Sequence, residues 1–301
     1  MLGVFGVLLR ASEILGADAA LRPVWREFLD NLAPLPVSDD PEALRPADYK
    51  GPRVFVRGLK PAIKGTGFLP DGNSLPMWFF DLCNVESGDR ERFATAVATY
   101  LQSFRNGITP RTPVSVLSKM AIAAASLGRG EDVRVLLPNQ IRPLTTERST
   151  AYKNGGVLAN RMTLREGPQA LDAERLGRAS EALHLALLQS SAPAPGEDPV
   201  LHVFPGWPKD WEARYSLFAR GAFVVSSSFR NGQVEFVEIE SKEGARCRLR
   251  NPFDGEAAIY RNGARAETRR EPLLEFATQK GERITVVAAN HAPAEFRRAV
   301  P

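Results

Sequence analysis

One stretch of the sequence combines side chains that could bind a polar ligand with a flat apolar face. Asp71 and Asn73 bring a carboxylate and an amide, and Trp78 follows shortly after them. Such a set suits a sugar, because carboxylates and amides hydrogen-bond hydroxyl groups and an indole ring packs against C–H groups. Asp71, Asn73 and Trp78 are therefore candidate substrate-binding residues. The sequence Asp71-Gly72-Asn73 is also typical of a turn, and a turn is the interpretation that we favour.

The sequence carries no motif that points to a cofactor. It has no phosphate-binding glycine loop, no GxGxxG after a strand and no HExxH. The two cysteines, Cys83 and Cys247, lie too far apart for a CxxC site, and the histidines are scattered. We therefore expect no metal and no cofactor.

The bulk composition is that of an ordinary globular protein. The chain has 301 residues, of which 44% are hydrophobic and 25% charged, a length that favours two domains. The net charge of +4 is dispersed, so we expect no nucleic-acid partner and no membrane partner. Residues 1–9 are apolar, but they lack a basic leader region and are too short to cross a bilayer. These features favour a core helix and a cytoplasmic chain, or one that lacks its leader.

The elements that position the candidate residues are mostly helices in the first part of the chain. Apolar residues recur there with a period near 3.6. A long polar segment rich in Pro and Gly, residues 37–76, interrupts this pattern, and we predict an ordered binding loop with a short strand at 53–57. The predicted helices cover about residues 4–15, 19–32, 87–104, 112–128, 132–137 and 172–190.

The hydrophobic period changes to two after residues 191–198, whose composition is that of a linker. Asn231-Gly232 and Asn262-Gly263 are hairpin-turn sequences between apolar runs. Closely spaced strands of this kind predict a β-sandwich over residues 199–301. The predicted strands cover residues 201–204, 216–219, 222–228, 234–239, 245–249, 257–260, 273–277 and 284–288.

Several separate pieces of residues 187–253 keep the order and spacing of a known family. They are Leu187-Leu188-Gln189-Ser190, then residues 203–208 (VFPGWP), residues 218–223 (FARGAF) and the run from 239 to 252. Together they resemble the segment that follows the last barrel helix in six-hairpin glycosidases of the glycoside hydrolase family 95 type, the bacterial α-L-fucosidase-like proteins. These pieces look structural, so they mark the family and not an activity.

The resemblance implies an α+β protein in which a toroid of twelve helices, an (α/α)6 barrel, precedes the β-domain. Residues 1–190 offer only five or six helices, so we expect a partial toroid, followed by the linker 191–198 and an antiparallel β-sandwich over 199–301. The chain is then a C-terminal half. A homodimer, or a missing N-terminal half, would cover the open helical edge. Full-length relatives are expected to be secreted or periplasmic.

The resemblance also implies a catalytic carboxylate. Inverting glycosidases use two, one as general acid and one as general base. In this family the base is an Asp at the start of the last barrel helix, and counting back from residues 187–190 places that position at Glu174. The sequence there, DAERLGRAS, departs from the family's DGNFGG: an Asn is lost, and the carboxylate is a Glu. Glu174 is the candidate base, Glu166 is its alternative, and the general acid stays open.

Both glutamates also have plain structural interpretations. A Glu in the first turn of a helix interacts favourably with the helix dipole, and Glu166 suits a solvated loop. Two functions therefore stay open. The first is a glycoside hydrolase that acts on a glycan or oligosaccharide by inversion. The second is a catalytically incomplete C-terminal fragment that serves as a carbohydrate-binding or structural module. The sequence does not fix the sugar.

Overall fold

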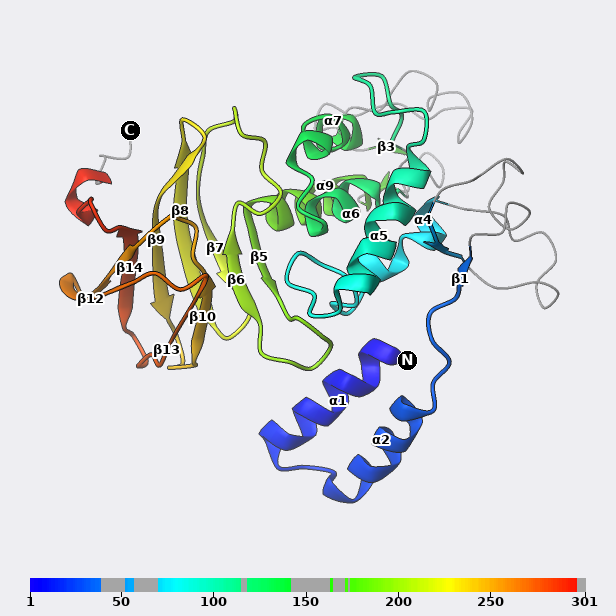
Figure 1. Cartoon of the computed structure of the whole chain (residues 1–301), viewed down its shortest axis with the longest axis horizontal. Coiled ribbons are helices and arrows are strands. Elements are labelled where there is room, and N and C mark those ends of the chain that lie inside the picture. Colours follow the sequence, from blue (N-terminus) through cyan, green and yellow to red (C-terminus); the bar gives the residue numbers. More distant parts are fainter. Residues whose placement is uncertain are drawn as a thin grey trace. The chain divides into compact units, whose positions relative to one another are not determined.

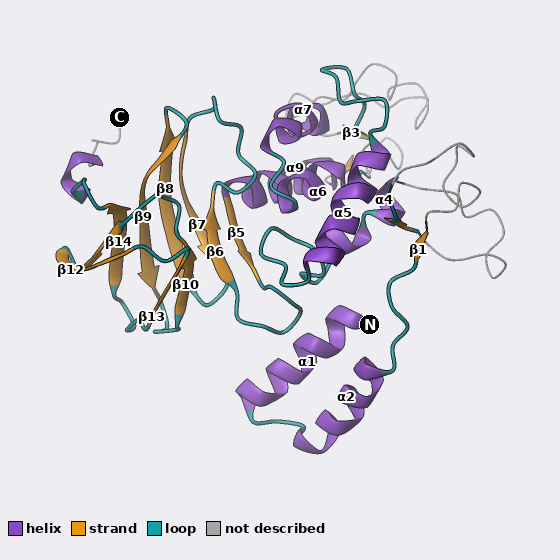
Figure 2. Cartoon of the chain, in the orientation of Figure 1, coloured by secondary structure: helices purple, strands orange, loops and turns teal. Residues whose placement is uncertain are grey.

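The computed structural model describes residues 1–38, 52–56, 70–114, 118–141, 163–164, 171–172 and 174–296. The chain divides into two compact units (Figure 1). The first comprises Met1–Leu183 with Ala192–Asp198, and the second comprises His184–Ser191 with Pro199–Pro301. The first is mainly helical, and the second is built from β-sheets (Figure 2).

The first unit begins with a pair of packed helices, α1 and α2. The helix α1 ends where Gly16 adopts a left-handed conformation, with φ 62°, and the ring of Phe5 on α1 stacks on that of Phe28 on α2 at 5.6 Å. Asp89 caps the start of α5, because its carboxylate accepts a hydrogen bond from the Arg92 N–H at 2.8 Å. The described elements of this unit are α1 (Leu2–Leu15), η1 (Ala19–Leu21), α2 (Arg22–Asp30), β1 (Val37–Ser38), β2 (Val54–Phe55), α4 (Pro70–Asn73), η2 (Leu75–Met77), α5 (Arg90–Ser103), α6 (Met120–Ser126), α7 (Gly130–Ile141), β3 (Thr163–Leu164), β4 (Leu171–Asp172) and most of α9 (Glu174–Leu187).

Two helix predictions in this unit need correction. The helix predicted over 112–128 is the shorter α6, which begins at Met120, and every residue of α6 is buried. The short turn predicted at 132–137 is the full helix α7, with Glu131 and Asp132 in its first turn. Acidic residues stabilise that end of a helix, so local chemistry supports the longer α7.

The segment predicted as a linker is packed against the first unit. The Asn84 side-chain amide donates to the Ala192 carbonyl at 3.0 Å, and Arg10 pairs with Asp198 at 2.8 Å. A Cβ on Gly6 would lie 2.5 Å from the Pro195 carbonyl oxygen, so α1 and this segment approach each other at backbone distance. Residues 192–198 thus belong to the folded body of the first unit.

The second unit contains a four-stranded sheet, in the order β13-β10-β6-β5, and a six-stranded sheet, in the order β12-β11-β14-β9-β8-β7. Within these sheets the described strands pair antiparallel, except for the parallel pair β6 and β10. The strands are β5 (Leu188–Ser191), β6 (Val200–Val203), β7 (Ala213–Ala219), β8 (Phe223–Arg230), β9 (Gln233–Ser241), β10 (Cys247–Arg250), β11 (Ala257–Arg261), β12 (Ala264–Arg269), β13 (Leu273–Phe276) and β14 (Arg283–Ala288), with η3 (Pro293–Phe296) after them.

Two strands of this unit were missed in the sequence. The helix predicted to run to Ser190 ends at Leu187, because Leu188–Ser191 pairs with Val200–Val203 as β5. The strand β12 is polar and exposed, so it lacks the alternation that marks the others. Both predicted hairpin turns are present: Asn231 and Asn262 have positive φ and each precedes a Gly with positive φ, as a two-residue turn requires.

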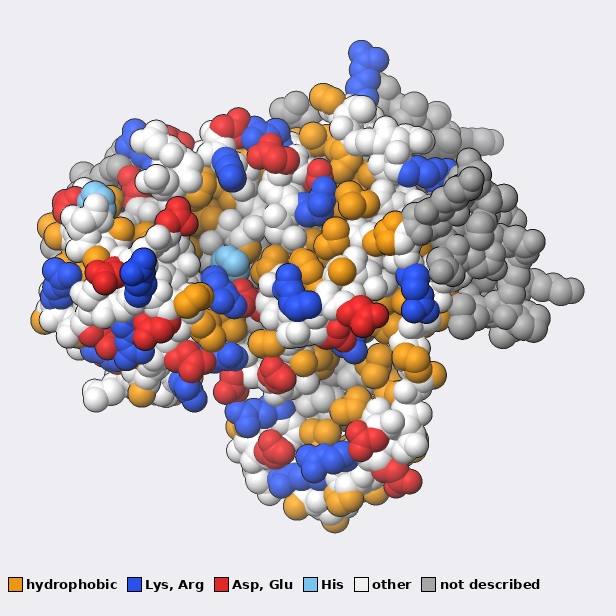
Figure 3. Space-filling model, viewed as in Figure 1, with side chains coloured by type: hydrophobic (Ala, Val, Ile, Leu, Met, Phe, Trp, Pro, Cys, Tyr) orange, Lys and Arg blue, Asp and Glu red, His pale blue; other side chains and the backbone are white. Residues whose placement is uncertain are grey.

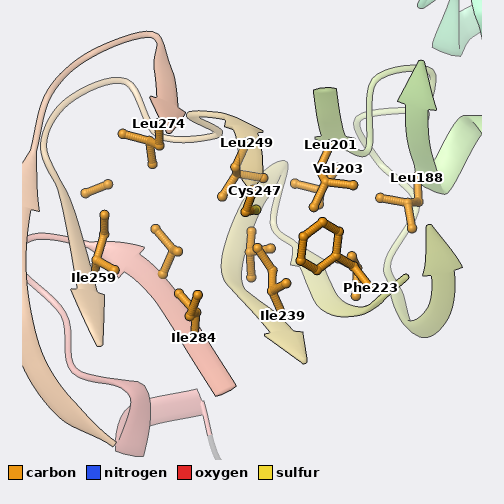
Figure 4. Packing of buried hydrophobic residues seen from close by; sticks show 14 of the residues in the cluster. Leu188, Leu201, Val203, Phe223, Ile239, Cys247, Leu249, Ile259, Leu274 and Ile284 are labelled. Atoms are coloured by element: carbon orange, nitrogen blue, oxygen red, sulfur yellow. The ribbon is translucent and has the colours of Figure 1, made fainter. Parts of the chain in front are cut away.

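Apolar side chains from both sheets fill one core between them (Figure 4). Leu249 and Leu274 of the four-stranded sheet and Ile239 of the six-stranded sheet are fully buried in it. Cys247 is also buried there, and burial raises the pKa of its thiol to about 12. It is therefore a protonated core side chain. Trp207 packs against the same core, and its ring N–H donates to the Trp211 carbonyl.

Candidate functional site

The helix α9 begins at Glu174, as its predicted place in a first turn requires. The side chain of Glu174 and the whole of Glu166 lie outside the described residues. Their assignment as general base and alternative base therefore stays a prediction. The helix itself supplies a fixed scaffold, because its later residues Ala182 and Ala186 are fully buried.

The predicted binding segment around residue 71 is helical rather than a simple turn. Asp71 lies in α4, with its side chain outside the described residues. Asn73 is only 2% exposed, and its amide donates a hydrogen bond of 2.6 Å to the Phe55 carbonyl on β2. The structure thus gives Asn73 the structural role of fixing α4 to β2, and a part in substrate binding stays a prediction.

Trp78 comes directly after η2 and is half-buried. Its ring N–H donates to the Ser74 hydroxyl at 3.2 Å, which sets the orientation of the indole. The Lys119 ammonium lies 4.5 Å from the centroid of the indole ring, a cation–π contact. Phe79 meets the ring edge-on at 5.5 Å. Trp78 is therefore held by several neighbours, with a positive charge over one face.

A carboxylate that the sequence analysis did not single out lies near this lysine. This residue is Glu181, which is exposed as a whole residue. Partial burial of its carboxyl group raises the pKa of that group, and the positive charges of Lys119 and Arg178 partly offset the rise. Three segments that are distant in sequence thus come together. The end of η2 carries Trp78, the start of α6 carries Lys119, and the middle of α9 carries Arg178 and Glu181. We call these four residues the α9 cluster.

The α9 cluster combines an indole ring, two cations and one carboxyl group. A carboxyl group with a raised pKa can hold a proton nearer neutral pH and donate it, and adjacent cations stabilise the carboxylate that remains. Glu181 follows Glu174 by two helical turns, so both occupy one face of α9 with about 10 Å between their backbone positions. No motif in the sequence marks Glu181, and only its spacing of seven residues from Glu174 connects it with a predicted site residue.

A second set of buried polar residues has a structural explanation. Asn84 and Glu86 are buried, and the side-chain Oδ1 of Asn84 accepts a hydrogen bond from the Glu86 N–H at 2.8 Å. The hydroxyl of Ser87 accepts from the Asn84 N–H at 2.8 Å. These bonds close a turn, and the Asn84 amide also binds the segment that contains Ala192. The set therefore joins parts of the first unit.

The described ranges contain neither a metal-binding cluster nor a helix that could cross a membrane. No group of three His, Cys, Asp or Glu side chains there is placed to hold a metal ion. The helices that the structure describes are all too short or too polar to cross a membrane. Charged side chains of both signs are interspersed on the surface shown in Figure 3.

Comparison with known proteins gives one family match. Residues 196–286 match the family described as glycoside hydrolase family 95, C-terminal domain. Among solved structures, the chain is similar to that of Ara127N-Se, a GH127 β-L-arabinofuranosidase from Geobacillus stearothermophilus T6, with 10% sequence identity and a TM-score of 0.24. The similarity covers 64% of this chain and only 31% of that chain. A search of curated proteins finds no match.

Proposed function

The C-terminal part of this chain resembles glycoside hydrolase family 95 proteins, and on that premise we propose that the chain is a glycoside hydrolase that acts on a glycan or oligosaccharide. The family match over residues 196–286 is the observation that carries this proposal. In this proposal the helical first unit is part of an (α/α)6 toroid, and α9 is its last helix. Packed helix pairs such as α1 with α2 and α6 with α7 support that architecture.

The proposed reaction is hydrolysis by inversion. Glu174 acts as the general base that activates water, with Glu166 as the alternative. Glu181 acts as the general acid, supported by its raised pKa and by the neighbouring Lys119. Inverting enzymes place their two carboxyl groups about 6.5–9.5 Å apart, on either side of the bond that is cleaved. Trp78, with Asp71 and Asn73 nearby in sequence, belongs to the substrate-binding wall.

The experiment is a hydrolysis assay on a set of neutral oligosaccharides, with proton NMR to read the anomer formed first. We expect the product anomer to be inverted relative to the substrate. Glu174→Gln and Glu181→Gln are each expected to lower kcat by about 10²–10⁴-fold, the usual contribution of a general acid or base. Retention of configuration, or full activity of both variants, would refute the assignment.

Glu91→Gln is the matched control. Glu91 is an exposed residue in the first turn of α5, so the substitution removes the same helix-dipole interaction without touching α9. Its cost of about 0.3–1 kcal/mol in stability should equal that of Glu174→Gln. A loss of activity in Glu91→Gln would show that helix stability, and not proton transfer, limits the reaction.

A second function, a catalytically incomplete carbohydrate-binding or structural module, is favoured by the surface of α1 and α2. Large apolar side chains are exposed there, including Ile14 at 69%, Leu15 at 76% and Phe28 at 56%. Large exposed apolar side chains, where they form a patch, usually pack against another chain or segment. A second copy of the chain, or an N-terminal half, would cover it.

Oligomeric state and activity together separate the two functions. If the chain is a binding or structural module, we expect light scattering to show a dimer for the wild-type chain. The double variant Ile14→Ser, Leu15→Ser should then be a monomer. Leu101→Ser is the control, because Leu101 is an exposed leucine on α5, away from this surface. Glycan binding without hydrolysis would support the module, whereas turnover by the chain alone would rule it out.

A further inference from the structure

The first unit contains a cavity of about 450 Å³ where α5 ends. Small-molecule sites typically measure about 300–1,000 Å³, so one or two sugar units would fit. The cavity is lined by residues 103–107 and 112–114, and by Ser118 and Met120 at the start of α6. Neither Trp78 nor Glu181 is among the lining residues, so the cavity is distinct from the α9 cluster.

The described lining is positively charged and partly aromatic. Phe104 supplies a half-buried ring, Arg105 a guanidinium group and Asn106 an amide. No acidic side chain is among these lining residues. Within the described part of the chain, the side chains of Arg105 and Asn106 make no hydrogen bond or ion pair, so both are available to a ligand.

The wall that carries these groups is held in place by local hydrogen bonds. The Gly107 N–H donates to the Phe104 carbonyl at 2.7 Å, with Gly107 at φ 81°. The hydroxyl of Thr112 accepts from the Thr109 N–H at 2.8 Å. Asn139 on α7 donates its amide to the Thr112 carbonyl at 2.9 Å. The loop is thus tied to a second helix, which lowers the ordering cost of binding.

We propose that this cavity binds an acidic sugar unit, one that carries a carboxylate or sulfate group. Arg105 forms a forked pair with the oxyanion, Asn106 hydrogen-bonds it or a ring hydroxyl, and Phe104 packs against the apolar face of the sugar. The C-terminal end of α5 carries a partial negative charge, which repels an anion. The full positive charge of Arg105 outweighs this repulsion. The inference rests on the proposed action on glycans and adds the class of sugar recognised.

The test is titration calorimetry of the whole chain with three probes: methyl β-glucuronide, glucose 6-sulfate and the neutral methyl β-glucoside. At low salt, we expect at least one anionic probe to bind about fivefold or more tightly than the neutral one. The preference should shrink at about 0.5 M salt, because Arg105 is exposed and salt screens its charge. The two anionic probes show whether the carboxylate or the sulfate is the preferred group.

Arg105→Ala should abolish the preference for the anionic probe, and Asn106→Ala should weaken it. Arg111→Ala is the matched control: it removes the same charge from the same exposed loop but does not line the cavity. Circular dichroism checks that each variant is folded. Equal binding of charged and neutral probes, or an equal loss in Arg111→Ala, would overturn the inference.

The two proposals fail separately. Turnover of neutral oligosaccharides without any preference for anionic probes would leave the glycosidase proposal standing and remove the acidic subsite. A preference for anionic probes that depends on Arg105, in a chain that hydrolyses no glycoside, would leave the subsite standing and remove the hydrolase.

Discussion

Leu249→Ala tests whether the shared core holds the two sheets of the second unit together. Leu249 is 0% exposed on β10, between its partners Leu201 on β6 and Leu274 on β13. The substitution removes three carbon atoms, worth about 0.8 kcal/mol each on burial. The cavity left behind adds to that loss, so we expect a cost of about 3 kcal/mol in the free energy of unfolding.

Amide hydrogen exchange measured by mass spectrometry follows each unit separately, which a single unfolding curve of a two-unit chain does not. A loss of about 3 kcal/mol lowers protection of the β8 and β9 peptides by roughly a hundredfold. Phe218→Ala is the control, because Phe218 is 69% exposed on β7. A loss below about 1 kcal/mol in Leu249→Ala, or an equal loss in Phe218→Ala, would refute the assigned core.

Three further predictions concern single groups. Burial raises the pKa of the Glu181 carboxyl above 4.5, so its stabilising contribution is complete below that pH and is lost as the pH rises through the folded-state pKa. Urea unfolding should therefore show Glu181→Gln gaining stability relative to wild type between acidic and neutral pH, and the opposite trend would contradict the assigned environment. Gly6→Ala should expose residues 192–198 to limited proteolysis, because the new Cβ would lie 2.5 Å from the Pro195 carbonyl oxygen; unchanged cleavage would count against that contact. Cys247, buried and with a thiol pKa of about 12, should resist iodoacetamide until the chain is denatured. Rapid labelling of the native protein would show an open core.

The candidate site combines one group that the family pattern identifies with others that only the structure identifies. Glu174 follows from its place at the start of the last predicted helix, and that helix does begin there. Lys119 and Arg178 carry no motif, and their effect on Glu181 depends on α6 and α9 lying close together. A test of the site therefore needs variants at both glutamates. The Glu174 variant tests the family pattern, and the Glu181 variant tests the environment that the structure gives.

The sequence by itself determined the features whose causes are local. Asn231-Gly232 and Asn262-Gly263 form the expected turns, because the required backbone conformation is a property of those residues. The alternation of apolar residues likewise placed strands such as β8 and β9. The ordered pieces between residues 187 and 253 were enough to indicate the family.

Only the tertiary structure decided the features that depend on distant partners. Leu188–Ser191 continues the helical pattern of α9, yet pairing with Val200–Val203 makes it a strand. The composition of residues 191–198 is that of a linker, but hydrogen bonds from Asn84 and Arg10 hold most of it against the first unit. Trp78 gains its cation–π partner from α6, far along the chain. Such contacts arise from packing between segments, which no local pattern in the sequence encodes.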